Sequence, residues 1–214
     1  MKFLNKIKLL FSTRFLVRRD IFHFVQKEVV GQEFDCVVDI GAGKAPFRKL
    51  IKAKKYIGID IEDRGFGDGL IIADINECVP LKDQSVDLVL MTEVLEHIKE
   101  PKAVLAEVYR ILKPGGKLIL TTPFVWPEHE TPNDFYRYTK YGLEYLLREA
   151  GFVNIDIKPS SGYGRTLLQL FCAPLRRKIF TPLVLASNLL GLLIFSSGDE
   201  SFPLVYLVSA RRDK

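Results

Sequence analysis

A glycine-rich turn near the start of the chain is the first stretch whose residues could perform chemistry. Residues 37–47 read VVDIGAGKAPF, in which an apolar run ends at Asp39 and is followed by Gly41 and Gly43. Glycine permits backbone dihedrals and close ligand approach that residues with a Cβ tolerate poorly. The pattern predicts a strand, a tight loop with backbone N–H groups free to face a ligand, and a helix with Pro46 in its first turn.

A carboxylate stands where a nucleoside-binding fold would use one. A second apolar run, residues 56–60, ends at Asp60, about 20 residues after the glycine loop, the spacing at which an acidic residue binds ribose hydroxyls. A dinucleotide fingerprint also requires a third glycine three positions after Gly43, where this chain has Pro46. The sequence therefore indicates a nucleoside ligand and weakens the case for the pyrophosphate of a nicotinamide cofactor.

Further motifs extend the pattern beyond the loop. They are TEVLEHI at residues 92–98, Pro101, and RILKPGG at residues 110–116. Together with the loop they resemble the class I S-adenosylmethionine-dependent methyltransferases of the type 11 group, over residues 36–158 and a final strand near 204–210. The family's loop carries a third glycine where this chain has Ala45. Two alternatives stay open: a nicotinamide-dependent oxidoreductase, and a relative that binds a nucleoside without turnover.

The resemblance implies S-adenosylmethionine as the cofactor and assigns residues to it. Its methionine end would lie against the glycine loop with the ammonium near Asp39, its ribose hydroxyls would bind Asp60, and its adenine would contact Ile61 and Asp74. The implied cofactor-binding set is Asp39, Gly41, Ala42, Gly43, Asp60, Ile61, Asp74, Ile75, Glu93 and His97. For the acidic members, the alternative is a helix cap or a solvated turn.

Ionisable residues also follow the fourth and fifth apolar runs. Glu93 and His97 are four residues apart, so they share one helical face if that segment is helical; the alternative is an ordinary surface pair. In the loop after the fifth run, His129 is a candidate general base, because an unperturbed pKa near 6.5 would let it take a proton from a hydroxyl. The same loop supplies the substrate or lid candidates Trp126, Asp134, Arg137 and Tyr138. With them His129 could equally form a structural lid, and His23 is expected to be structural.

Apolar periodicity predicts the elements that must position these residues. Strands are expected at residues 36–40, 56–59, 70–73, 86–91, 118–122, 152–158 and 204–210, and helices at 101–112 and 139–150. Alternating strands and helices predict an α/β, Rossmann-like, doubly wound sheet. The resemblance adds that it has seven strands with the last one antiparallel. The expected division is an N-terminal basic amphipathic helical extension, residues 1–34, and a methyltransferase domain, residues 35–214.

Two basic, apolar segments flank this domain. The N-terminal segment is expected to be helical from residue 2 to 30, with Phe3 and Ile7 on its apolar face and a break near Ser12-Thr13. Its lysines interrupt every apolar run, so it is not expected to be a signal peptide. An apolar insertion, about residues 162–200, is predicted between strands six and seven. A single membrane crossing there would place the last strand on the wrong side of the bilayer, so an in-plane helix, a hairpin, a core element or a dimer element stay open.

Charge and cysteine content narrow the partners. The net charge of +5 is unevenly distributed. Residues 1–19 hold six basic and no acidic side chains, and residues 161–198 hold four basic side chains, Arg176 among them, and no acidic ones. The rest of the chain has 21 basic and 26 acidic side chains. Basic charge confined to apolar segments favours an anionic membrane surface over nucleic acid. Three scattered cysteines predict no metal site and no disulfide, and favour the cytoplasm.

The expected function is therefore methyl transfer from S-adenosylmethionine. The acceptor atom is expected to be an oxygen, such as a sugar hydroxyl, of a small or lipid-linked molecule. The expected location is the cytoplasm, with docking on the inner face of the membrane or homodimer formation as the alternatives for the apolar insertion.

Overall fold

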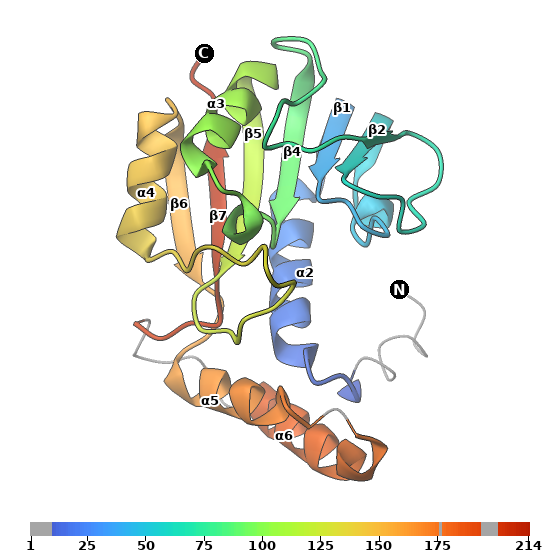
Figure 1. The fold of residues 1–214 in the computed structure, drawn as a ribbon, viewed down its shortest axis with the longest axis vertical. Helices are drawn as coiled ribbons and strands as arrows, with labels where there is room; N and C mark the ends of the chain where they lie inside the picture. The colour runs from blue at the N-terminus through green and yellow to red at the C-terminus, as the bar shows by residue number, and fades with distance from the viewer. Residues whose placement is uncertain (1–9, 176, 194–200) are drawn as a thin grey trace.

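The computed structural model describes residues 10–175, 177–193 and 201–214, and a seven-stranded sheet forms its centre (Figure 1). The strands are β1 Glu33–Ile40, β2 Lys52–Asp60, β3 Leu70–Ile72, β4 Val86–Thr92, β5 Leu112–Pro123, β6 Val153–Pro159 and β7 Val205–Arg211. Their order is β3-β2-β1-β4-β5-β7-β6, with β7 antiparallel to both neighbours and the other pairs parallel. The predicted seven-stranded sheet with an antiparallel last strand is confirmed.

Alternate residues of the central strands are buried against opposite layers of helix. Val38 and Val89 belong to a core shared with α3 (Pro101–Ile111) and α4 (Lys140–Glu149), which cover one face of the sheet (Figure 1). Val37 and Leu88 belong to a second core shared with α2 (Phe15–Val29) on the other face. Successive side chains of a strand point to opposite faces, so a strand covered on both sides is apolar throughout.

The helix expected after the glycine loop is not formed, and that prediction is wrong. Only the 3₁₀ turn Arg48–Leu50 lies between β1 and β2. Because β2 begins at Lys52, four residues before the predicted start at Tyr56, the segment 41–51 is too short to hold both the tight turn and a full α-helix. The side of the sheet next to the glycine loop is covered by α2, whose Phe22 ring lies 6.5 Å from the ring of Phe47.

The other boundaries shift by smaller amounts. α3 ends near the predicted residue, but the Lys113-Pro-Gly-Gly stretch continues directly into β5, which begins at Leu112 and not at Leu118. Gly115 supplies a positive φ of 75° there, and the pairing of β4 with β5 shifts register between Val86 and Leu88. In the N-terminal segment, α2 begins at Phe15 after a turn that matches the predicted break, while Phe3 and Ile7 lie outside the described residues.

The apolar insertion is a helical hairpin beyond the carboxyl edge of the parallel strands. It consists of α5 (Tyr163–Cys172), the 3₁₀ turn η3 (Lys178–Phe180) and α6 (Thr181–Leu193), and it lies against the N-terminal end of α2 (Figure 1). Arg176 falls outside the described residues. Among the helices that the structure describes, none combines the length and the apolarity needed to cross a bilayer.

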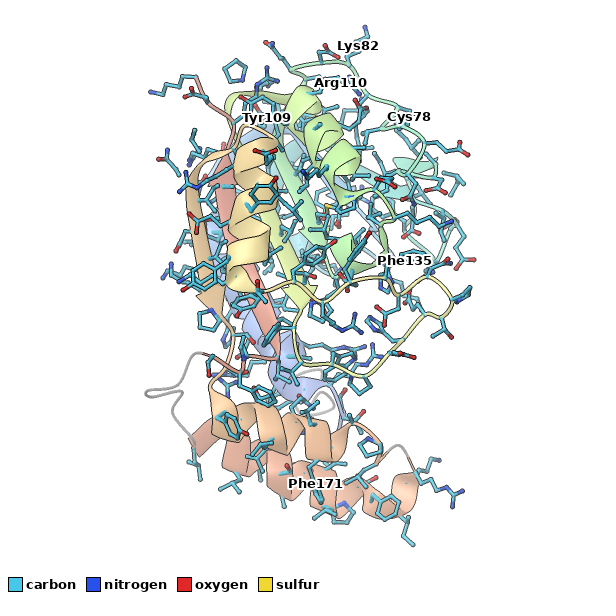
Figure 2. All side chains as sticks on the ribbon, turned by 60° about the vertical axis from the view of Figure 1, so that its left-hand side comes forward. Cys78, Lys82, Tyr109, Arg110, Phe135 and Phe171 are labelled. Carbon is cyan, nitrogen blue, oxygen red and sulfur yellow. The ribbon has the colours of Figure 1, made fainter. Side chains whose placement is uncertain are left out.

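Buried polar contacts fix one side of this hairpin. Gln169 Oε1 accepts from Leu16 N at 2.9 Å, Asn188 Nδ2 donates to the Leu10 and Ser12 carbonyls at 2.7 and 3.0 Å, and Arg165 pairs with Asp20 at 2.8 Å. The other side is exposed, with Phe171 at the end of the molecule away from Arg110 (Figure 2). The exposed apolar side chains of the hairpin are Leu167, Phe171, Ile179, Phe180, Leu183, Leu189, Leu190, Leu192 and Leu193.

Candidate cofactor and acceptor site

The glycine loop adopts the left-handed backbone that its sequence predicts. Gly41 has φ +64° and Gly43 has φ +51°, and the non-glycine Ala45 has φ +49°. A Cβ added at Gly41 would lie 2.3 Å from Cγ2 of Val94, whereas one added at Gly43 would meet nothing within 4 Å. Gly41 is therefore required by packing against the segment after β4, and Gly43 leaves open space beside the backbone where a ligand can approach.

Asp60 is held in a fixed orientation at the carboxyl end of β2. Its Oδ2 accepts from Gly43 N at 2.8 Å and its Oδ1 accepts from Ile61 N at 2.8 Å, and the residue is 9% exposed. These two bonds tie the end of β2 to the glycine loop of β1. The exposed Ile61 side chain follows directly, and the binding of ribose by Asp60 and of adenine by Ile61 stays a prediction.

The other predicted cofactor residues lie at the same edge but differ in burial. Asp39 is buried and accepts from the Tyr56 hydroxyl at 2.7 Å, and burial raises the pKa of its carboxyl to about 7. Asp74 is exposed, and its Oδ1 accepts from the backbone and side-chain nitrogens of Asn76 at 2.9 Å. The next residue, Ile75, is buried. Oδ1 of Asp74 thus holds this turn in place.

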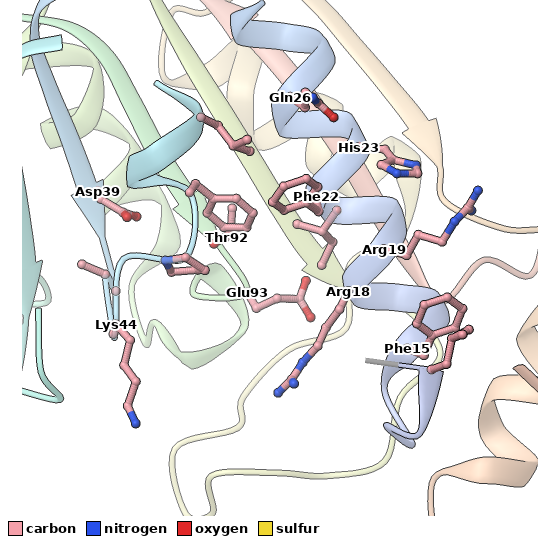
Figure 3. A pocket seen from close by; sticks show the side chains of 18 residues that line it. Phe15, Arg18, Arg19, Phe22, His23, Gln26, Asp39, Lys44, Thr92 and Glu93 are labelled. Atoms are coloured by element: carbon pink, nitrogen blue, oxygen red, sulfur yellow. The ribbon is translucent and has the colours of Figure 1, made fainter. Parts of the chain in front are cut away.

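A cavity of about 1050 Å³ opens between the glycine loop and α2 (Figure 3). Asp39, Ala42 and Glu93 line it from the sheet side, and Arg18 and Phe22 line it from α2. Because the connection between β1 and β2 contains no α-helix, α2 forms the opposite wall of the cavity on this side of the glycine loop. The sequence analysis predicted the N-terminal helix as an extension and assigned none of its residues to the site. The helical spacing of its apolar residues indicated a helix but not that this helix lines the cavity.

Glu93 and His97 do not share a helical face, because the segment that holds them is not an α-helix. Only Leu95–His97 forms a 3₁₀ turn, and Glu93 precedes it with a positive φ of 56°. The Glu93 side chain lies beside Thr121, whose Oγ1 donates to Oε1 at 3.0 Å, and burial raises the pKa of the Glu93 carboxyl to about 7. His97 lies instead against the loop after β5, with Nδ1 2.6 Å from the carbonyl oxygen of Asn133.

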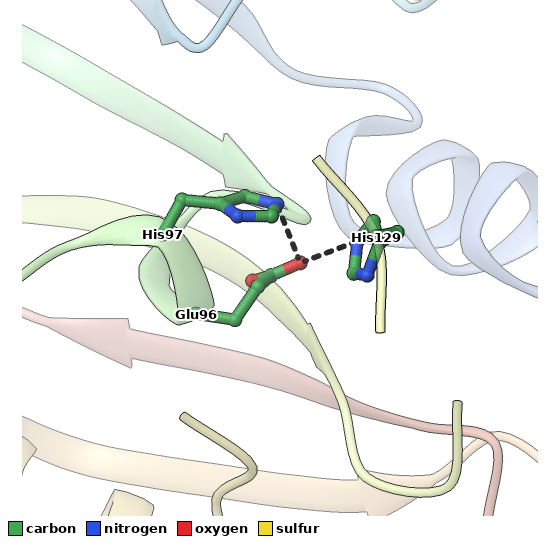
Figure 4. Close-up of side chains that lie close together, drawn as sticks. All are labelled: Glu96, His97 and His129. Atoms are coloured by element: carbon green, nitrogen blue, oxygen red, sulfur yellow. Dashed lines mark ion pairs between the residues drawn. The ribbon is translucent and has the colours of Figure 1, made fainter. Parts of the chain in front are cut away.

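Three ionisable side chains meet between the loops after β4 and β5. Oε1 of the fully buried Glu96 lies 3.7 Å from Nε2 of His97 and 3.9 Å from Nε2 of His129 (Figure 4). This cluster of Glu96, His97 and His129 was not predicted; the acidic position of Glu96 inside the apolar stretch TEVLEHI was the available signal. Burial raises the pKa of Glu96 well above its ordinary value and lowers that of His129, which keeps the His129 ring neutral at pH 7.

The loop after β5 is anchored by its own polar residues. Asp134 accepts from His129 N at 2.9 Å and from both terminal nitrogens of Arg137 at 2.7 Å, and the guanidinium holds the pKa of Asp134 well below its usual range. Tyr138 is buried and donates to the Leu95 carbonyl at 3.1 Å. Trp126 lies under the guanidinium of Arg14, 5.7 Å from it. These residues hold the loop against the cluster, while a direct contact with substrate stays a prediction.

Comparison with known proteins finds relatives of this chain. Residues 38–120 match the family model described as a methyltransferase domain. A probable S-adenosylmethionine-dependent methyltransferase from Mycolicibacterium smegmatis is 36% identical over 131 residues, which cover 54% of this chain and 51% of that protein. The ubiquinone biosynthesis O-methyltransferase of Pseudomonas entomophila is 27% identical over 124 residues, which cover 58% of this chain and 48% of that protein.

A solved structure adds the fold over most of the chain. Phosphoethanolamine N-methyltransferase 2 of Haemonchus contortus, in complex with S-adenosyl-L-methionine, has a TM-score of 0.64 at 16% identity, covering 92% of this chain and 53% of that one. This chain spans 64%, 51% and 48% of the length of three curated relatives that it matches. Residues 38–120, which run from β1 through the glycine loop to β5, thus match a methyltransferase domain, and the chain as a whole is similar to class I S-adenosylmethionine-dependent methyltransferases.

Proposed function

We propose that the protein transfers a methyl group from S-adenosylmethionine to an oxygen of a small or lipid-linked acceptor, with a sugar hydroxyl as the expected group. Asp60 carries this proposal: its carboxylate is buried to 9% exposure, tied to the glycine loop through Gly43, and adjacent to the exposed Ile61. A carboxylate held in this way is oriented for ribose hydroxyls before any ligand binds. The open space beside Gly43 admits the methionine part of the cofactor.

The rival nicotinamide cofactor fits these residues less well. A pyrophosphate is bound by the N-terminus of the helix that follows the glycine loop. In this chain the whole segment 41–51 is described and contains only the 3₁₀ turn Arg48–Leu50, while Pro46 stands in place of the third glycine. The loop therefore lacks both the helix end and the glycine that a dinucleotide requires.

The cofactor supplies a methyl group on a positively charged sulfur, which leaves as a neutral thioether and needs no acid. The residues of this chain must then hold the acceptor close, exclude water and remove the hydroxyl proton. The anchored loop after β5 supports water exclusion. His129, neutral because burial lowers its pKa, supports proton removal, which is the reason to favour oxygen over nitrogen. The similarity to an O-methyltransferase of ubiquinone biosynthesis agrees with this choice.

The helical hairpin supports a lipid-linked acceptor at an anionic membrane surface. It emerges from β6, whose carboxyl end lies on the same edge as the cofactor residues, since β6 runs parallel to β5. Its outer side exposes apolar residues such as Ile179 and Leu193, each more than 70% exposed, and Ile179 directly follows Arg177 and Lys178. Arg165, by contrast, is buried in its pair with Asp20 and adds nothing to the surface charge. Apolar side chains that enter the headgroup layer beside cations bind anionic lipid reversibly.

Two measurements test this function. Titration calorimetry should give one S-adenosylmethionine bound per chain and no binding of a nicotinamide dinucleotide. Incubation with lipid-linked sugars should then release S-adenosylhomocysteine. Cofactor binding without release from any hydroxylated acceptor would favour the nucleoside-binding relative, and nicotinamide binding would overturn the proposal.

Flotation with phosphatidylglycerol vesicles tests the membrane surface. The wild type should float at low salt and less at high salt. The double variant Ile179→Glu, Leu193→Glu should float at least about tenfold less, because it puts carboxylates in place of apolar side chains that would enter the headgroup layer. Tyr141→Glu on α4 is the matched control, since Tyr141 is 79% exposed and belongs to a helix outside the hairpin. A wild type that stays unbound and monodisperse, or that dimerises through the hairpin, would contradict membrane docking.

A further inference from the structure

The cluster of Glu96, His97 and His129 brings together donor types that metal sites use. Glu96 and His97 come from the turn after β4, and His129 comes from the loop after β5 (Figure 4). One oxygen of Glu96 and one nitrogen of each histidine all lie within 4.8 Å of one another. Ligands about 2.0 to 2.2 Å from a metal stand roughly 3.4 Å apart in a tetrahedral site, so only a small contraction would bring the three onto one ion.

The ring of His97 is already oriented as a metal ligand. Its Nδ1 lies 2.6 Å from the backbone carbonyl oxygen of Asn133. A carbonyl accepts only, so this bond places the proton on Nδ1 and leaves Nε2, the atom that faces Glu96, with a free lone pair. Metal-binding histidines in proteins are oriented by this kind of bond from the other ring nitrogen.

The ring of His129 has a comparable partner on its far side. Its Nδ1 lies 3.3 Å from Oδ2 of Asp134, at ion-pair distance but without hydrogen-bond geometry, and Nε2 again faces Glu96. Asp134 is itself fixed by the fork of Arg137. A slight rotation of the ring would complete the carboxylate, histidine and metal arrangement that orients many ligands.

Glu96 supplies an independent observation that a ligand is expected here. The residue is fully buried, and its Oε1, the atom between the two histidines, has no hydrogen-bond partner in the described structure. A buried carboxylate oxygen without a partner is costly unless a cation or a proton donor meets it. Neither histidine does so, since both Nε2 atoms lie beyond hydrogen-bond distance.

We propose that Glu96 Oε1, His97 Nε2 and His129 Nε2 bind a divalent transition-metal ion. Two imidazoles and one carboxylate form a donor set for zinc and for other first-row ions, with coordination positions left for water or a substrate oxygen. The sequence predicted no metal site from its scattered cysteines, and His129 is remote along the chain from the other two ligands proposed here.

The ion would serve the acceptor, and this role rests on the proposed function. A bound cation would hold a hydroxyl oxygen and lower its pKa, so that the hydroxyl would lose its proton to water and the oxygen would then be the nucleophile. His129 would then act as a ligand and not as the predicted general base. An acceptor with two adjacent oxygens, as in a sugar diol, would suit the remaining positions.

Calorimetry with Zn²⁺ tests the site on the full-length, tag-free protein after treatment with a chelator. The wild type should bind one Zn²⁺, and His97→Ala and His129→Ala should each weaken Zn²⁺ binding by about 100-fold or more. Asp134 orients His129 without being a ligand, so Asp134→Asn should weaken Zn²⁺ binding by only about 10 to 100-fold. Glu96→Gln keeps the side-chain shape and should weaken binding similarly. Co²⁺ added to the wild type should give visible absorption bands that the histidine variants lack.

His23→Ala is the control, because His23 is the third histidine of the chain and lies in α2 outside the cluster. Its Zn²⁺ affinity should match the wild type within about twofold. Equal Zn²⁺ binding by the wild type and by His97→Ala, or no Zn²⁺ binding by the wild type, would overturn the metal site and leave His129 as the predicted base. Zn²⁺ binding without S-adenosylmethionine binding would uphold the site and count against the proposed function.

Discussion

On the cofactor side of the site, both oxygens of Asp60 accept backbone N–H groups, whereas on the acceptor side Oε1 of the buried Glu96 has no hydrogen-bond partner in the described structure. The first carboxylate is satisfied by the fold itself, so the cradle is formed before a ligand arrives. The second is left for a ligand to satisfy. In the function proposed above, the fixed side would bind the cofactor, and the side with the unpartnered carboxyl oxygen would respond to the acceptor.

Asp39 provides the sharpest test of this contrast between satisfied and unsatisfied carboxyl groups. It lies on the same side as Asp60 but is buried, and among the described residues its side chain has a single side-chain hydrogen-bond partner, Tyr56. Its pKa in the folded protein is about 7, above the 3.8 of the unfolded chain, so folding favours the protonated carboxyl. The stability that Asp39 contributes is therefore largest below pH 4 and is lost as pH rises to about 7, by at most about 4 kcal/mol. Urea unfolding of the wild type and of Asp39→Asn between pH 5 and 8 measures this.

The difference in unfolding free energy between wild type and Asp39→Asn should fall with pH and become flat above about pH 7. If that difference does not change with pH, Asp39 is stabilised as an anion by the loop. The cofactor side would then be satisfied throughout, and the contrast with Glu96 would be stronger.

Substitution of Gly41 tests whether packing or ligand access shapes the loop. Gly41→Ala adds a Cβ 2.3 Å from Val94 at φ +64°, so it should lose about 1 to 3 kcal/mol from overpacking and a further 1 kcal/mol or so from backbone strain. Gly43→Ala has the strain alone, since nothing lies within 4 Å. Denaturant unfolding should rank them in that order. Equal losses of unfolding free energy in the two variants would mean that Val94 moves aside for the added Cβ, so that packing against the segment after β4 does not determine the loop conformation.

Asp60→Ala should weaken S-adenosylmethionine binding roughly tenfold to a hundredfold, because it removes a charged acceptor of two hydroxyls. Asp74→Ala is the matched comparison at the exposed end of the same edge, and it should weaken binding less, since one Asp74 oxygen serves its turn with Asn76. Titration calorimetry on folded variants measures both. An unchanged affinity in Asp60→Ala would remove the main support for the cofactor side as described.

Sequence reasoning predicted much of the fold and of the cofactor side because both depend on residues close together in the chain. A strand buried on both faces needs a continuous apolar run, as in residues 88–91, and parallel strands must end at one edge. Asp60 and the glycine loop therefore had to meet there. The connection after the loop was predicted wrongly because the length of β2, and not the loop's own pattern, leaves no room for a helix.

Only the tertiary structure decided the rest, since it depends on contacts between distant residues. Gln169 accepts from Leu16, 153 positions away, and Asn188 donates to Leu10, so the hairpin and the N-terminal segment dock through polar groups that no periodicity pairs. His97 and His129 likewise face the buried Glu96 from two separate loops. The motif TEVLEHI can be recognised in the sequence. Which of its side chains is buried, and which residues it contacts, depends on the positions of the loops that follow β4 and β5.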